Sequence, residues 1–181
     1  SSETNCKEFL RPYLAEAVAS VCGDDVELCA VCVAKGMEFL NAPYETIQKV
    51  TEELVRRDGE RYCFSKSQEE VDTLLWEAQL KYVFPLVENY RRYFVKKYYD
   101  FIKAALPINN GYGDQVMVPE EAELGNLMYL VERGGIPVSA EESMELKRYR
   151  KARNELAHMN LLSNEELCVI LKAGKHKTAS D

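Results

Sequence analysis

Helix-start signals recur along this chain, and they constrain its fold more than any other feature. A capping box is a Ser followed three residues later by a Glu, and the two residues satisfy each other's backbone N–H groups at the first turn of a helix. Three such boxes occur, each followed by apolar residues at three- and four-residue steps. The boxes are Ser67-Gln68-Glu69-Glu70, Ser139-Ala140-Glu141-Glu142 and Ser163-Asn164-Glu165-Glu166. The sequence therefore predicts an all-α fold.

The first third of the chain predicts three further helices. One ends at Gly23, Asp25 is placed to cap a second that runs to Leu40, and Pro43 is placed to begin a third. A glycine turn at residues 58–60 then leads into residues 61–64, which predict a short strand. Three helices followed by such a turn are similar to a winged-helix unit, so residues 1–66 are expected to form a separate segment. It has two candidate roles, a packing or linking module and a contact with nucleic acid.

Residues 67–172 predict a bundle of helices. The first helical pattern extends to Leu106, and Pro85 inside it predicts a kink or a break near Val83. Turn-forming residues at 107–119 predict a loop, and helices are expected over 120–133, from 140 to His158, and from 164 to Lys172. Residues 173–181 are polar and predict a disordered tail.

Charge restricts the ways in which the chain can bind a polyanion. A net charge of -7 argues against a protein that coats nucleic acid through a uniformly basic surface. Basic residues gather in two places, at 91–97 and at 147–153. Each cluster is either a solvated helix face or a patch that faces phosphates. Any contact with nucleic acid is therefore expected to be local.

The cysteines and the apolar residues bear on the compartment. Cys29 and Cys32 form a single CxxC pair inside a helical pattern, which lacks the second pair of a zinc site and is typical of small buried side chains. With 46% apolar residues the chain is expected to fold without disulfides. It contains no signal peptide and no apolar run of about 18 residues. We therefore expect a cytoplasmic protein without a membrane segment, and the first residue, Ser1, indicates that upstream domains precede it in a longer parent chain.

One run of residues combines groups that act on phosphodiesters: Arg153-Asn154-Glu155-Leu156-Ala157-His158. Asn154 and His158 share a helix face, and Arg153 lies about 140° around the helix from His158. Histidine titrates near pH 6.5 and exchanges protons at cellular pH, while arginine binds phosphate through two parallel hydrogen bonds. This chemistry needs neither a metal nor another cofactor, and none is predicted. In the alternative, purely structural interpretation, Arg153 pairs with a carboxylate and His158 caps the helix.

The RNxxxH pattern near the end of a capped helix resembles the HEPN family of small helical bundles, over residues 67–172. The resemblance implies an endoribonuclease that cleaves RNA by attack of the 2'-hydroxyl, with Arg153, Asn154 and His158 as its catalytic residues. The family's toxin subset has a Tyr two residues after the His, where this chain has Asn160. That difference puts toxin-type regulation through the tyrosine in doubt.

Two functions follow as expectations. The first is the effector part of a larger stress or phage-defence protein, a metal-independent endoribonuclease whose Lys147, Arg150 and Lys151 bind RNA. A symmetric homodimer is expected, because two copies would gather enough positive charge in one cleft to hold a polyanion. The second is a non-catalytic HEPN-type adaptor that binds a nucleotide or a protein partner.

Overall fold

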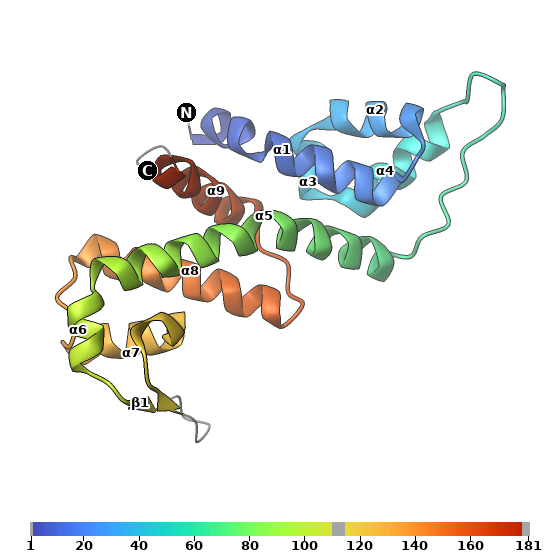
Figure 1. Ribbon diagram of the computed structural model, residues 1–181. Helices are drawn as coiled ribbons and strands as arrows, with labels where there is room; N and C mark the ends of the chain where they lie inside the picture. Colours follow the sequence, from blue (N-terminus) through green and yellow to red (C-terminus); the bar gives the residue numbers. More distant parts are fainter. Residues whose placement is uncertain (1, 110–114, 179–181) are drawn as a thin grey trace. The chain divides into compact units, whose positions relative to one another are not determined.

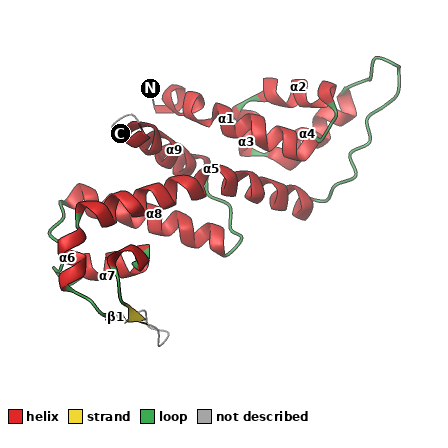
Figure 2. Cartoon of the chain, viewed as in Figure 1, coloured by secondary structure: helices red, strands yellow, loops and turns green. Residues whose placement is uncertain are grey.

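The computed structural model describes residues 2–109 and 115–178, and side chains within 8–109 and 115–174 (Figure 1). In this part of the chain the regular structure is helical apart from one short hairpin (Figure 2), so the predicted all-α fold is confirmed. The chain divides into two compact units. Unit 1 comprises Ser1–Val83 and Leu156–Asp181, and unit 2 comprises Phe84–Glu155.

Unit 1 is built from helices of both ends of the chain. Helix α1 packs against α2 and α9, and α2 packs against α3 and α4. The bounds are α1 Ser2–Cys22, α2 Val26–Lys35, α3 Met37–Asn41, α4 Pro43–Glu53, α5 Gln68–Lys97 and α9 Asn164–Thr178. Only the first part of α5 belongs to unit 1. Because α9 extends beyond Lys172, part of the predicted tail is helical, and residues 179–181 lie outside the described residues. The predicted boundaries after residues 66 and 172 stay predictions, since compactness does not test independent folding.

The predicted second helix is interrupted. Gly36 adopts a positive φ of 56°, which separates α2 from α3. Leu28 and Cys32 are the buried residues of α2, whereas Val26 and Val33 are exposed. The start of α2 is as predicted, because an Asp25 carboxylate oxygen accepts a hydrogen bond of 3.0 Å from the backbone N–H of Leu28.

The predicted strand is reduced in the structure, and a pair of strands that the sequence did not predict is present. The strand expected at residues 61–64 is reduced to a single bridge between Val55 and Arg61. The loop expected at 107–119 contains an antiparallel pair, β1 Ile108–Asn109 with β2 Gln115–Val116. Residues 110–114 between them lie outside the described residues.

Unit 2 has an aromatic core. The rings of Tyr90 on α5 and Tyr149 on α8 are stacked, with centroids 4.0 Å apart and planes 10° apart. The other elements of this unit are α6 Tyr99–Ala104, η1 Pro119–Glu121, α7 Leu124–Glu132 and α8 Ala140–Ala157. Helix α5 continues through Pro85, so of the two predicted alternatives the break is wrong and the kink stays a prediction. The helix ends at Lys97 instead of near Leu106. Of the aromatic side chains between residues 90 and 101, Tyr90, Phe94 and Tyr98 are buried and Tyr93, Tyr99 and Phe101 are exposed.

All three predicted capping boxes are present. In each of them the backbone N–H of the Glu donates to the Ser hydroxyl at 3.1 to 3.2 Å, and the Ser backbone N–H donates to the Glu carboxylate. They begin α5, α8 and α9. In the described ranges no helix combines the length and the apolar character that a membrane-spanning helix requires.

One of these boxes gives unit 2 an acid-sensitive contact. The Glu142 carboxylate accepts hydrogen bonds from the Lys97 ammonium, from the backbone of Ser139 and from the Tyr98 hydroxyl, and these lower its pKa from 4.5 to about 2. A carboxyl whose pKa is lower in the folded chain stabilises the fold above pH 4.5, and this stabilisation is lost as the pH falls toward 2.

We therefore expect Glu142→Gln to reduce the dependence of the unfolding free energy on pH between about 4.5 and 2.5. Urea unfolding at several pH values in this window measures it. Glu141→Gln is the matched control, because Glu141 is exposed and makes no ion pair with another described residue. Equal pH dependence in Glu142→Gln and the unsubstituted chain would contradict the assignment.

Candidate functional site

Helix α8 presents three of the predicted site residues on one exposed face. Its buried side carries Leu146, Tyr149, Ala152 and Leu156. Lys147, Lys151 and Asn154 follow one another at steps of four and three residues and so share a face, over a length of about 10 Å. The two lysines are exposed and Asn154 is half-buried. Arg150 is exposed as well, about 60° around the helix from Lys147.

Arg153 is exposed and directed toward its neighbour. Its Nη1 lies 3.5 Å from the Oδ1 of Asn154, a distance at the long limit of a hydrogen bond. Among the described residues no carboxylate lies within 4 Å of the Arg153 guanidinium, so the carboxylate pair of the structural interpretation does not form. The guanidinium therefore keeps donors available for an anion.

His158 lies just after α8 and not inside it. The helix was predicted to reach His158 but ends at Ala157, and Met159 adopts a positive φ of 61° that turns the chain away. The imidazole is exposed and makes no hydrogen bond with any residue of the described part, so it does not cap the helix. Because the division between the units falls after Glu155, Arg153 and Asn154 belong to unit 2 and His158 to unit 1.

Helix α5 holds the segment around His158 through two side chains that the sequence did not point out as functional. The indole Nε1 of Trp76 donates to the carbonyl of Leu156 at 2.8 Å. The Gln79 amide forms hydrogen bonds with both polar backbone groups of Leu162. Its Oε1 accepts from the N–H at 2.8 Å, and its Nε2 donates to the carbonyl at 3.0 Å. Gln79 is buried, and its position on the apolar face of the helical pattern was the signal that could have identified it.

The other basic cluster is engaged within unit 2. Arg91 and Arg92 both donate to the Glu88 carboxylate, whose pKa the Arg91 hydrogen bond lowers to about 2. Arg91 also donates to the backbone carbonyls of Glu120 and Ala122, at 2.7 and 3.1 Å. A surface pocket of about 430 Å³ lies beside these residues. We assign this cluster to structural ion pairs.

Neighbouring arginines in that cluster should differ in their effect on stability. Arg91→Met removes bonds to two backbone carbonyls from a side chain that is 15% exposed, and we expect it to lower the unfolding free energy by about 1–3 kcal/mol. Arg92→Met is the control, because its side chain is 72% exposed, and we expect a loss below about 0.5 kcal/mol. Chemical denaturation measures both. Equal losses would show that Arg91 has no special structural role.

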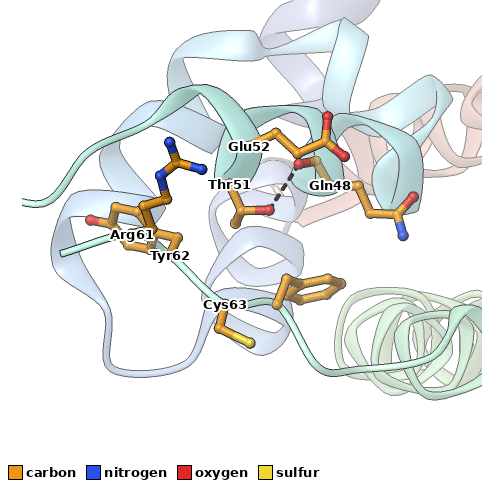
Figure 3. A pocket seen from close by; sticks show the side chains of 7 residues that line it. Gln48, Thr51, Glu52, Arg61, Tyr62 and Cys63 are labelled. Carbon is orange, nitrogen blue, oxygen red and sulfur yellow. Dashed lines mark hydrogen bonds between the residues drawn. The ribbon is translucent and has the colours of Figure 1, made fainter.

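Unit 1 contains a second surface pocket, of about 420 Å³, between α4 and the extended segment that follows Arg61 (Figure 3). Inside it the Thr51 hydroxyl donates to the backbone carbonyl of Gln48 at 2.8 Å. Cys63, an exposed free thiol, lies on its other side. Phe64 also lines the pocket. None of its lining residues belongs to the RNxxxH motif, and their arrangement identifies no ligand.

The cysteines differ in burial and in bonding state. Cys32 is buried and free, as the sequence predicted, while Cys29 is free and half-buried. Within the described ranges, no three His, Cys, Asp or Glu side chains are arranged to hold a metal ion. Cys168 is disulfide-bonded. Disulfides are typical of oxidising compartments, so a cytoplasmic location stays a prediction.

Comparison of the chain with protein-family models, with curated proteins and with solved structures finds no significant match in any of the three. The function of the chain must therefore be argued from its own residues and their geometry.

Proposed function

We propose that this chain is a HEPN-type, metal-independent endoribonuclease that cleaves RNA by attack of the 2'-hydroxyl on the adjacent phosphate. The observation that carries the proposal is the availability of the motif's polar groups. Arg153 and His158 are exposed and make no ion pair with any described carboxylate, although the chain contains 30 acidic residues. The arginines at 91 and 92 are paired instead. Unpaired charge at the end of an ordered helix favours a ligand-binding role.

Each motif residue would act on one part of this reaction. His158 removes the proton of the 2'-hydroxyl while water protonates the leaving 5'-oxygen, or His158 protonates the leaving 5'-oxygen while water takes the 2'-hydroxyl proton. Arg153 donates to the phosphate oxygens, on which negative charge grows in the transition state. Asn154, beside the guanidinium, keeps Arg153 in place or donates to the same phosphate. The products would be a 2',3'-cyclic phosphate and a 5'-hydroxyl.

Lys147, Arg150 and Lys151 would hold the rest of the RNA. They lie on the exposed part of α8, within about 10 Å of Asn154 along the helix axis. Lysine and arginine side chains bind the phosphate backbone without regard to sequence, so this surface would contribute affinity more than specificity.

The experiment that tests the function is an RNA cleavage assay in EDTA with the 181-residue chain. Labelled single-stranded RNA should yield fragments that end in a 2',3'-cyclic phosphate, and RNA with 2'-O-methyl groups should stay intact. Cleavage of the methylated RNA would contradict attack by the 2'-hydroxyl.

A non-catalytic adaptor is the second candidate, and the proximity of Arg153 and Asn154 within unit 2 favours it. This pair alone can bind a phosphate. Calorimetric titration with nucleotides and short RNAs separates the two functions, because an adaptor would bind without turnover.

The ribonuclease proposal includes a symmetric dimer. A single chain with a net charge of -7 offers a polyanion one Arg153 and one lysine-bearing face, whereas two copies would place both sets along one cleft. We expect an interface that buries on the order of 1,200–2,000 Å² in total and includes α8. Sedimentation velocity at micromolar concentration measures the mass. A monomer at all concentrations that support cleavage would rule out the shared cleft.

A further inference from the structure

The segment that carries His158 is short, exposed and fixed at both ends. We define the His158 turn as residues 157–161. It begins after Leu156 and ends before Leu162, and both of these residues are buried. Of the five residues between them, none is buried, and Met159 has a positive φ. A turn of this kind has little packing of its own, so its conformation depends on how its two ends are held.

The first end is held by Trp76. The last carbonyls of a helix lack partners within the helix, and Leu156 lies in the last turn of α8. Its carbonyl accepts two hydrogen bonds, one from the Trp76 indole at 2.8 Å and one from the backbone N–H of Met159 at 3.2 Å. The indole therefore fixes the carbonyl on which the turn closes.

The second end is held by Gln79. Its amide bonds the N–H and the carbonyl of Leu162, and its other N–H donates to the Tyr13 hydroxyl at 3.3 Å. Both N–H groups of the amide and one of the two lone pairs of its oxygen thus take part in hydrogen bonds within unit 1. Trp76 and Gln79 are three residues apart on α5 and share a face. One face of a single helix therefore anchors both ends of the turn.

We infer that Trp76 and Gln79 are positioning residues that act together to fix the backbone of the His158 turn, and through it the imidazole. The link from this turn to RNA cleavage rests on the proposed function. A proton-transfer group must be placed accurately, and a displacement of about 1 Å can lower the rate about 10²-fold. Trp76 and Gln79, both on α5, fix the two ends of the turn and so contribute to this accuracy.

The first test measures the turn itself by amide hydrogen exchange in the full chain. Gln79→Met removes the amide bonds at one end, and the reporter is the N–H of Met159, which bonds Leu156 at the other end and does not contact Gln79. We expect Met159 to exchange about tenfold faster or more. Trp76→Phe is the second variant, which removes the indole donor together with part of the ring, and it should increase exchange of the Leu162 N–H at the other end of the turn.

Thr46→Val is the matched control. Thr46 is buried in unit 1, and its hydroxyl donates to the backbone carbonyl of Glu38 at 3.2 Å, so this variant loses one buried hydrogen bond away from the turn. If Gln79→Met changes exchange only at the Leu162 N–H and Trp76→Phe only at the Met159 N–H, the two side chains do not act together and the inference is wrong. The inference is also wrong if neither variant increases exchange in the turn more than Thr46→Val does.

The second test measures cleavage. With the turn loosened, kcat should fall about 10- to 100-fold in both variants while KM stays within about twofold, because RNA-binding residues on α8 are unchanged. Unchanged kcat with a loosened turn would refute the link to catalysis. If the unsubstituted chain does not cleave RNA, the proposed function fails, and the positioning role is then decided by the exchange result alone.

Discussion

Replacing His158 with Ala should lower kcat for RNA cleavage by about 10²- to 10⁴-fold, the usual contribution of a placed proton-transfer group. KM should change little, because in the proposed function the imidazole acts on the proton of the reacting hydroxyl and the lysines of α8 supply the affinity. Single-turnover cleavage with the enzyme in excess measures the chemical step directly. His158→Gln should be as inactive as His158→Ala, since an amide donates hydrogen bonds but does not exchange protons near pH 7.

The chain contains its own control for this substitution. It has two histidines, and His176→Ala makes the same chemical change at a position outside the RNxxxH motif in the sequence, so it should leave kcat unchanged. If His158→Ala retains full cleavage, or if His176→Ala loses as much, His158 is not the proton-transfer group. Absence of cleavage by the unsubstituted chain would move the preference to the adaptor.

Local signals in the sequence predicted where helices begin better than where they end. A capping box is complete within four residues, so α5, α8 and α9 begin as predicted. The end of α8 depends on Met159, which adopts a left-handed conformation that its residue type does not favour. The bond from Trp76 to Leu156 joins residues 80 positions apart, and no spacing rule connects them. Predictions of the motif therefore named its residues and missed what holds them.

The two basic clusters show what charge patterns do and do not predict. Glu88 precedes Arg91 by three residues and Arg92 by four, a helical spacing that favours ion pairs and that the sequence already contained. On α8, Glu142 precedes the basic residues at 147–153. Its carboxylate pairs instead with Lys97, a partner that only the tertiary structure brings close. Whether a basic run is available to a ligand thus depends on contacts beyond its own helix.

Arg153→Ala should lower kcat by about 10²- to 10³-fold, the usual loss when one donor to a developing oxyanion is removed. Arg153→Lys should recover only part of the rate, because an ammonium keeps the charge but lacks two parallel donors. The decisive measurement is the separation of kcat from KM at constant salt. A role in the transition state lowers kcat, whereas a role in binding alone raises KM and leaves kcat unchanged.

Arg148→Ala is the matched control for Arg153→Ala. Arg148 lies on the same helix, is exposed and makes no ion pair with another described residue, so the two variants lose equal charge. Its kcat should stay within about twofold of the unsubstituted chain, since a remote charge acts mainly on the encounter with RNA. Equal losses of kcat in both variants would mean that net charge, and not the Arg153 guanidinium, limits cleavage. An increase in KM alone for Arg153→Ala would assign Arg153 to RNA binding. It would contradict the proposal that the Arg153 guanidinium stabilises the negative charge of the phosphate in the transition state.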